Sequence, residues 1–240
     1  MNIVWHDKTQ NLANIASSAR KARQVEASLL VVPEMATTGF TMDLSQAQKE
    51  TEQAYQKIAK QNGIAILGTY AAQGDGHATN RAVFIDEKGT VRARYDKQHL
   101  FPLGKEHEHY QAGTKDAVVS YLELSFGLSI CYDLRFPELY RALVQKGANV
   151  LVVPANWPAS RREHWLTLLK ARAIENQCYI IGVNRVGTDG NGLEYSGDSV
   201  VFDPWGEEIV HADGNEQLLI VELDKKKIDE IRKEYPFLKK

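Results

Sequence analysis

The stretch PELYRALVQKGANVLVVP, residues 137–154, joins a helical pattern to a run of β-branched residues that ends at a proline. Residues 12–33 repeat this unit, because apolar positions at helical spacing again lead into a continuous run, SLLVV, before Pro33. Residues 161–183 form a third such unit. Unbroken apolar runs are typical of strands buried on both faces. The sequence therefore predicts an α/β protein whose helices pack outside buried sheets.

Shorter patterns between and after these units predict further strands and one more helix. We expect strands at 64–71, 80–85, 91–95, 199–202 and 218–221, a turn at 86–89, and a final charged helix at 224–233. Two sheets covered by helices on their outer faces give a four-layer α-β-β-α sandwich. A TIM barrel is the alternative, but it needs a more regular alternation of strand and helix than residues 64–95 show.

Length and composition indicate the class of protein. The 240 residues fit one domain, residues 1–240, and the 29 basic and 31 acidic residues nearly cancel without forming blocks of one sign. We therefore expect no nucleic-acid partner. No apolar stretch approaches the ~20 residues that span a bilayer, which excludes membrane insertion. With only two cysteines and no export signal at the start, we expect a reduced, cytoplasmic protein.

The segment LSICYDLR, residues 128–135, places Cys131 where an apolar strand ends and polar residues begin the next helix. Such an elbow exposes the sulfur and directs the following backbone N–H groups toward a bound acyl group, as a nucleophile requires. The alternative is that Cys131 is a small buried apolar residue. For Cys178, inside an apolar run, only this second interpretation applies.

Two further polar residues follow strand ends. Glu34 comes directly after the apolar run that ends at Pro33, and Lys97 follows the strand expected at 91–95. Taken alone, each is an ordinary solvated residue. Taken with Cys131, the segments PE (33–34), KQHLF (97–101) and CYDLRFPE (131–138) resemble the Glu-Lys-Cys triad of the nitrilase superfamily of carbon–nitrogen hydrolases.

The resemblance extends over essentially the whole chain and implies the same α-β-β-α sandwich. It includes TGF (38–40), NRA (80–82), PANWP (154–158), ARAIEN (171–176) and GDS (197–199). Members of the superfamily usually begin with an apolar strand before the segment matching 2–7, where this sequence has only Met1. We therefore expect that the native chain starts earlier or that a neighbouring segment takes the place of this strand.

Residues 184–199 are similar to the ω-amidase branch, which hydrolyses the terminal amide of 2-oxoglutaramate and related α-keto acid amides. In this interpretation Cys131 attacks a small-molecule amide, Glu34 transfers protons, and Lys97 with the backbone N–H of Tyr132 stabilises the oxyanion. The reaction needs neither a metal nor another cofactor. The resemblance also implies a homodimer joined through the helix faces.

A supporting glutamate is expected between Lys97 and Cys131. The resemblance favours Glu106 for this role, with Glu108 as the alternative. His107 and His109 alternate with these glutamates, but a His-x-His pair without a third ligand is a weak metal signal. We therefore expect no metal here.

Substrate-binding candidates follow from the chemistry of the substrate. A keto acid carries a carboxylate, which arginine binds well, so Arg161 and Arg185 are both candidates and the sequence does not choose between them. Arg135 is expected to be a structural partner of Asp133 or Glu138, and His99 is expected to be structural. The remaining candidates are Phe40, Asn156 and Trp157.

Three other functions stay open at this point. The same triad could hydrolyse an N-carbamoyl amino acid or β-ureido acid, or a nitrile. A catalytically silent subunit of this fold, acting in protein interactions, is the alternative outside enzymes. The complete triad argues against the silent subunit, and the run at 184–199 favours the ω-amidase branch.

Overall fold

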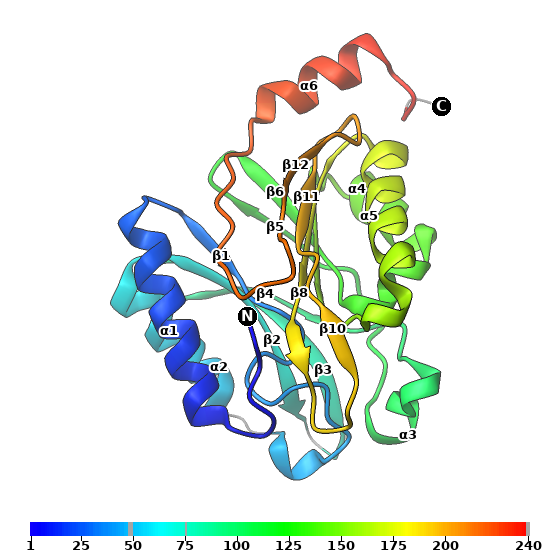
Figure 1. Cartoon of the computed structure of the whole chain (residues 1–240). Helices are drawn as coiled ribbons and strands as arrows, with labels where there is room; N and C mark the ends of the chain where they lie inside the picture. The colour runs from blue at the N-terminus through cyan, green and yellow to red at the C-terminus, as the bar shows by residue number, and fades with distance from the viewer. Residues whose placement is uncertain (48–49, 75, 239–240) are drawn as a thin grey trace.

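The computed structural model describes residues 1–47, 50–74 and 76–238. Two β-sheets pack face to face, and helices lie outside them (Figure 1). The first sheet has the order β1 (Leu29–Val31), β2 (Ala65–Gln73), β3 (Ala78–Ile85), β4 (Val91–Asp96). The second has the order β12 (Glu208–His211), β11 (Val200–Phe202), β8 (Tyr179–Asn184), β7 (Val150–Ala155), β6 (Leu124–Leu128), β5 (Val118–Tyr121). The predicted four-layer sandwich is confirmed.

Two pairs of helices form the outer layers. α1 (Lys8–Gln24) and α2 (Glu50–Asn62) cover the first sheet, and α4 (Pro137–Gln145) and α5 (Arg162–Asn176) cover the second. Short elements complete the fold: α3 (Glu106–His109), α6 (Lys225–Glu234) and a separate hairpin of β9 (Val186–Thr188) and β10 (Glu194–Ser196). None of the helices in the described ranges is long and apolar enough to cross a membrane.

The apolar runs in the sequence became the buried strands. β7 runs parallel to both β6 and β8 and is buried along its whole length. One core cluster fills the space between the two sheets, where the ring of Phe84 on the first lies 5.7 Å from that of Phe126 on the second, and it continues under α4 and α5. A second cluster lies under α1 and α2, around Ile15 and Tyr55. The helix–strand units predicted at 12–33, 137–154 and 161–183 are therefore confirmed.

The strand expected at 218–221 is wrong, because these residues have no regular secondary structure. Their burial does alternate: Leu219 and Val221 are half-buried, whereas Ile220 is exposed. This alternation explains why the pattern predicts a strand. A strand also needs a neighbour for its backbone hydrogen bonds, and no described strand pairs with this segment.

The fold brings together strand ends from both sheets. β1 leads to Glu34 and β4 to Lys97 on the first sheet, whereas β6 leads to Cys131 and β7 to Asn156 on the second. Polar residues from distant parts of the sequence thus meet at one edge of the sandwich.

Candidate active site

Glu34 is fully buried at the end of β1. Thr69 on β2 fixes the backbone on both sides of it, because the Met35 N–H donates to Thr69 Oγ1 at 2.6 Å and that hydroxyl donates to the Pro33 carbonyl at 3.3 Å. Met35 has a positive φ of 44°, a conformation that is uncommon outside glycine and collects at functional sites. The turn after β1 thus directs the Glu34 carboxylate into the space between the sheets.

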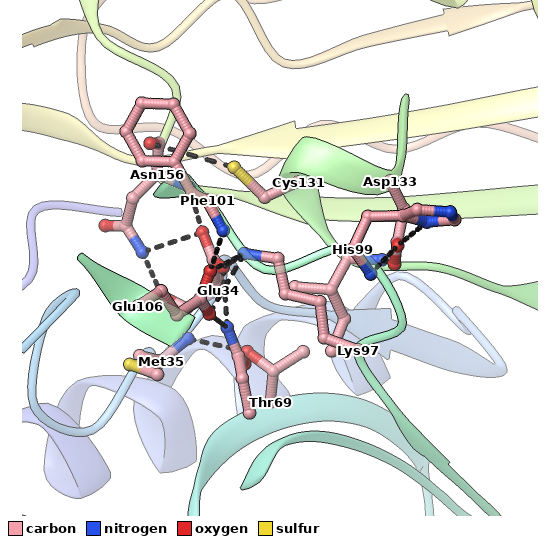
Figure 2. Close-up of polar contacts among 12 residues, drawn as sticks. Glu34, Met35, Thr69, Lys97, His99, Phe101, Glu106, Cys131, Asp133 and Asn156 are labelled. Atoms are coloured by element: carbon pink, nitrogen blue, oxygen red, sulfur yellow. Dashed lines mark hydrogen bonds and ion pairs between the residues drawn. The ribbon is translucent and has the colours of Figure 1, made fainter. Parts of the chain in front are cut away.

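Lys97 follows β4 and is fully buried beside two carboxylates (Figure 2). Its Nζ lies 2.9 Å from Glu34 Oε1 and 2.9 Å from Glu106 Oε2. Burial favours the neutral amine, but the charges of Glu106 and Glu34 outweigh it and raise the pKa of Lys97. Lys97 is therefore a permanent cation. It also holds the two carboxylates together.

Glu106 opens the short helix α3 and is buried, whereas Glu108 is exposed. Its Oε2 accepts a hydrogen bond from the Phe101 N–H at 2.7 Å in addition to the contact with Lys97. The residue before it, Lys105, has a positive φ of 54°. The structure therefore brings Glu106 to Lys97 and leaves Glu108 outside, which agrees with the order in which the sequence favours them.

The pKa values of Glu34 and Glu106 are shifted by burial, by Lys97 and by neighbouring hydrogen-bond donors. Burial raises the pKa of Glu34, but the charge and hydrogen bond of Lys97 and the N–H of Asn156 lower it below its usual range. Burial raises the pKa of Glu106, with the attraction of Lys97 opposing the shift and the charge of Glu34 adding to it. Glu34 is therefore the more acidic of the two carboxyl groups and is ionised.

Cys131 begins a 3₁₀ helix, Cys131–Arg135, directly after the chain leaves β6. It has a positive φ of 47° and an exposed fraction of 8%, and its Sγ lies 3.9 Å from the Asn156 carbonyl oxygen. Burial and the charge of Glu34 raise the pKa of this thiol. Cys131 therefore rests as a thiol and needs a base in order to react.

Cys178 differs from Cys131 in its surroundings. It is fully buried in the apolar core at the start of β8, and burial raises its pKa to about 12. It is absent from the cavity that Cys131 lines. Its predicted structural place in the core agrees with these contacts.

Asp133 connects the cysteine turn to the lysine loop. This buried carboxylate accepts from the Tyr95 hydroxyl at 2.7 Å, the Ile130 N–H at 2.9 Å and the His99 N–H at 3.0 Å, and His99 Nδ1 lies 2.8 Å away. The expectation that Arg135 pairs with Asp133 or Glu138 is therefore wrong. Arg135 instead lies 5.0 Å from the Trp157 ring and 3.1 Å from His164 Nδ1.

A cavity of about 680 Å³ opens onto Glu34, Lys97 and Cys131. Four aromatic residues and three cationic residues are among those that line its walls. The aromatic residues are Phe40, Phe101, Tyr132 and Trp157, and the cationic residues are Lys105, Arg135 and Arg161. A volume of this size is typical of a small-molecule site. Lys97 Nζ lies 5.3 Å from the centre of the Phe40 ring, which places this ring beside the buried charged cluster of Glu34, Lys97 and Glu106, which we call the floor.

Two residues singled out in the sequence, Asn156 and Arg185, form structural hydrogen bonds within the protein. The Asn156 N–H donates to Glu34 Oε2 at 2.9 Å and its side chain donates to the Glu34 carbonyl at 2.6 Å, so Asn156 fixes Glu34 while it lines the cavity. Arg185 does not line the cavity. It is fully buried, and its Nη2 donates to the carbonyls of Ile3 at 3.1 Å and Thr188 at 3.2 Å. Arg185 as a substrate-binding residue is therefore contradicted by its position.

Sequence reasoning missed a chemical role for Asn80, although this residue lies among the charged groups. Its Nδ2 donates to Glu34 at 2.8 Å and to Glu106 at 2.9 Å. A lone asparagine on a strand carries no chemical signal, so only its place in the resembling NRA segment could have drawn attention to it.

The acidic and histidine residues near the site form no metal-binding cluster in the part of the chain that the structure describes. His107 and His109 are both exposed. The oxygens of Glu34 and Glu106 already accept hydrogen bonds from fixed donors.

Comparisons with known proteins agree with this geometry. The chain matches the carbon-nitrogen hydrolase family over residues 1–233. It is 40% identical to omega-amidase YafV of Escherichia coli K12, with 98% of this chain and 91% of the relative covered. It is 38% identical to 2-oxoglutaramate amidase of Bacillus subtilis, with 88% and 83% covered.

A solved structure is also close. A CN-hydrolase superfamily protein of Xanthomonas campestris, whose crystal structure has an arsenic adduct in the active site, superposes with a TM-score of 0.92. It is 32% identical, and the match covers 99% of this chain and 92% of that protein. The chain thus belongs to the carbon-nitrogen hydrolase family. It is an enzyme that hydrolyses amides, and the ω-amidases are among its relatives.

Proposed function

We propose that this enzyme hydrolyses the terminal amide of a small α-keto acid amide of the 2-oxoglutaramate type, through a thioester on Cys131. The observation that carries the proposal is that Glu34, Lys97 and Cys131 line one cavity, with Lys97 bonded to Glu34 at its floor. The similarity to omega-amidase YafV and to the 2-oxoglutaramate amidase of B. subtilis supports this substrate class.

In the first half of the reaction, Glu34 takes the proton of the Cys131 thiol while Sγ attacks the amide carbon. The raised pKa of the thiol makes this base necessary, and the lowered pKa of Glu34 keeps the base ionised. The tetrahedral oxyanion is stabilised by the Lys97 ammonium and the backbone N–H of Tyr132. Glu34 returns the proton to the amide nitrogen, the carbon–nitrogen bond breaks, and ammonia leaves a thioester.

In the second half, Glu34 removes a proton from a water molecule that attacks the thioester carbon. The same two donors stabilise the second oxyanion. The carbon–sulfur bond then breaks, the proton returns from Glu34 to Cys131, and the product leaves as a carboxylic acid that ionises in water. Glu106 does not move a proton in this scheme, and it keeps Lys97 in place as a cation.

The cations around the cavity select the substrate carboxylate. The Arg161 guanidinium lies 5.5 Å from the Phe101 ring centre and has no hydrogen bond or ion pair among the described residues, and the same holds for the Lys105 ammonium. A guanidinium can bind a carboxylate through two parallel hydrogen bonds. We therefore assign the carboxylate to Arg161, with Lys105 contributing charge, and place the aromatic rings of Phe40 and Trp157 against the carbon chain.

Two further features belong to the proposal. We place the enzyme in the cytoplasm, since both cysteines are free and a reducing compartment keeps them so. We also propose a homodimer, on the resemblance to the superfamily. The helix faces are the expected contact, and the exposed apolar side chains Ile174 and Trp205 lie at the carboxyl end of α5 and beside it. Light scattering on the purified protein tests the mass of the assembly.

A substrate panel tests the proposed activity. Ammonia release is measured with 2-oxoglutaramate, succinamate, N-carbamoyl-β-alanine and an aromatic nitrile, and we expect the highest kcat/KM for 2-oxoglutaramate. A higher kcat/KM for the carbamoyl compound or the nitrile would assign the enzyme to those branches. The absence of turnover on every member of the panel would favour the silent subunit.

A further inference from the structure

Asn80 occupies the centre of the charged floor. It lies on β3 and is fully buried. Its side-chain amide donates both hydrogens to carboxylates, one to Glu34 Oε1 at 2.8 Å and one to Glu106 Oε1 at 2.9 Å. Its backbone carbonyl accepts the Lys97 N–H at 2.9 Å. Asn80 thus contacts the base, the supporting glutamate and the lysine at once.

The bonds of Asn80 distinguish the two oxygens of Glu34. A carboxylate offers about two acceptor positions on each oxygen. At Oε1 both are filled, by Asn80 at 2.8 Å and Lys97 at 2.9 Å. At Oε2 the only short bond is from the Asn156 N–H, at 2.9 Å. The Asn156 side-chain amide lies 3.5 Å from Oε2, too far for a strong bond, so Oε2 is the oxygen with room for another donor. The Asn156 carbonyl also accepts from the Cys131 sulfur at 3.9 Å.

We propose that Asn80 is a positioning residue that fixes Glu34 with Oε2 toward Cys131, so that this one oxygen receives and returns the proton in every step. The inference rests on the proposed function, because it takes Glu34 as the base. It adds a residue to the machinery and assigns the proton transfer to a single atom.

The physical need for such a residue comes from the charges of the floor. The carboxylates of Glu34 and Glu106 are both buried and both lie 2.9 Å from the same Lys97 ammonium, so that they are close enough to repel each other. A second lysine would neutralise the base, whereas an amide donates to both carboxylates without adding charge. Its hydrogen bonds also favour the ionised form of both carboxyl groups: they add to the lowering of the Glu34 pKa and oppose the raising of the Glu106 pKa. Asn80 therefore keeps Glu34 ionised as well as oriented.

The role of Asn80 predicts how the pH dependence of kcat/KM changes when its side chain is removed. Removing a donor from an ionised carboxylate raises its pKa, so the acid limb of kcat/KM should move to higher pH. We expect Asn80→Ala to shift this limb by about one unit and to lower kcat by about 10²-fold, with KM within about threefold. Asn80→Ser keeps one donor, and we expect effects between those of Asn80→Ala and the wild type.

The control is Asn11→Ala. Asn11 is equally buried, but its amide group donates only to the backbone carbonyls of Val4 and Thr37. Its removal should lower thermal stability and leave the acid limb in place. If Asn80→Ala does not fold, Asn80→Ser is measured in the same way, because the smaller hydroxyl fits the same space.

The outcome separates this inference from the proposed function. An unshifted acid limb in folded Asn80→Ala or Asn80→Ser, with kcat within about threefold of the wild type, would overturn the role of Asn80. Glu34→Gln is the companion variant. If it hydrolyses amides at the wild-type rate, Glu34 is not the base, and the proposed mechanism fails together with the inference. If it is inactive and Asn80→Ser is normal, only the inference fails.

Discussion

At the floor of the cavity each charged side chain has an opposite charge within 3 Å, whereas at its mouth Lys105, Arg135 and Arg161 have no carboxylate bound to them among the described residues. The floor consists of Glu34, Lys97 and Glu106 and is fully buried, whereas the guanidinium groups of the mouth belong to half-buried residues. We refer to these two regions as the floor and the mouth.

The difference follows from access to water. A buried ion without a partner is strongly unfavourable, so each charge of the floor must be paired with an opposite charge of the floor, which holds these side chains in place. Water stabilises the cations at the mouth, so that they need no protein partner before a ligand binds. We infer that the floor determines the reaction and the mouth determines which amide is hydrolysed. The floor should therefore control kcat, and the mouth should control KM.

The largest effect is expected for the nucleophile. Cys131→Ala should abolish ammonia release, because no other thiol lines the cavity. Cys178→Ala is the matched control, since it removes the same sulfur from the apolar core and should leave most of the activity. Ammonia release at saturating 2-oxoglutaramate measures both. An active Cys131→Ala enzyme would disprove the thioester route.

Lys97→Gln tests the floor at its centre. We expect the hydrolytic rate to fall by about 10²-fold to 10³-fold, because one oxyanion donor is lost and two carboxylates face each other without the ammonium between them. The variant should keep the fold, and its Cys131 should still be alkylated slowly by iodoacetamide. Lys97→Arg should not restore the rate, since a planar guanidinium cannot take the place of a compact ammonium. Near-normal turnover of Lys97→Gln would remove the lysine from the mechanism.

The predictions for Cys131 and Lys97 concern residues that sequence analysis alone had already singled out. Glu34, Lys97 and Cys131 each follow a strand end, and their order along the chain is specific to one superfamily. The fold was equally predictable, since continuous apolar runs have few alternatives to buried strands. Both the fold and the family are confirmed.

Other features depend on contacts that no local pattern encodes. Arg185 follows β8 much as a site residue would, but its side chain points into the protein and binds backbone carbonyls. Asp133 pairs with His99, which lies far from it in the sequence, and not with the nearby Arg135. The segment 218–221 has the alternation of a strand but no partner among the described strands. In each case the direction of a side chain or the presence of a neighbour decides the outcome.

Arg161→Ala tests the mouth. A charge-assisted hydrogen bond contributes roughly 1.5–3 kcal/mol, so we expect KM for 2-oxoglutaramate to rise by at least about tenfold, while kcat changes little. Arg162→Ala is the matched control, because the next arginine in the chain is paired with Asp198 at 2.9 Å and lines a different cleft. Equal KM values for the two variants would assign the carboxylate to another cation.

The smallest effect is expected for removal of metals. Exhaustive dialysis against a chelator should leave kcat and KM unchanged, because Lys97, Asn80 and backbone N–H groups already occupy most acceptor positions of the acidic floor. The one alternating His and Glu segment, at 106–109, has its two histidines exposed and Glu106 bonded to Lys97. A His107→Ala, His109→Ala double variant is the control and should behave like the wild type before and after dialysis. Activity that falls on dialysis and returns with zinc would show that the floor binds a cation other than Lys97, and the comparison between an internally paired floor and an open mouth would then have to be abandoned.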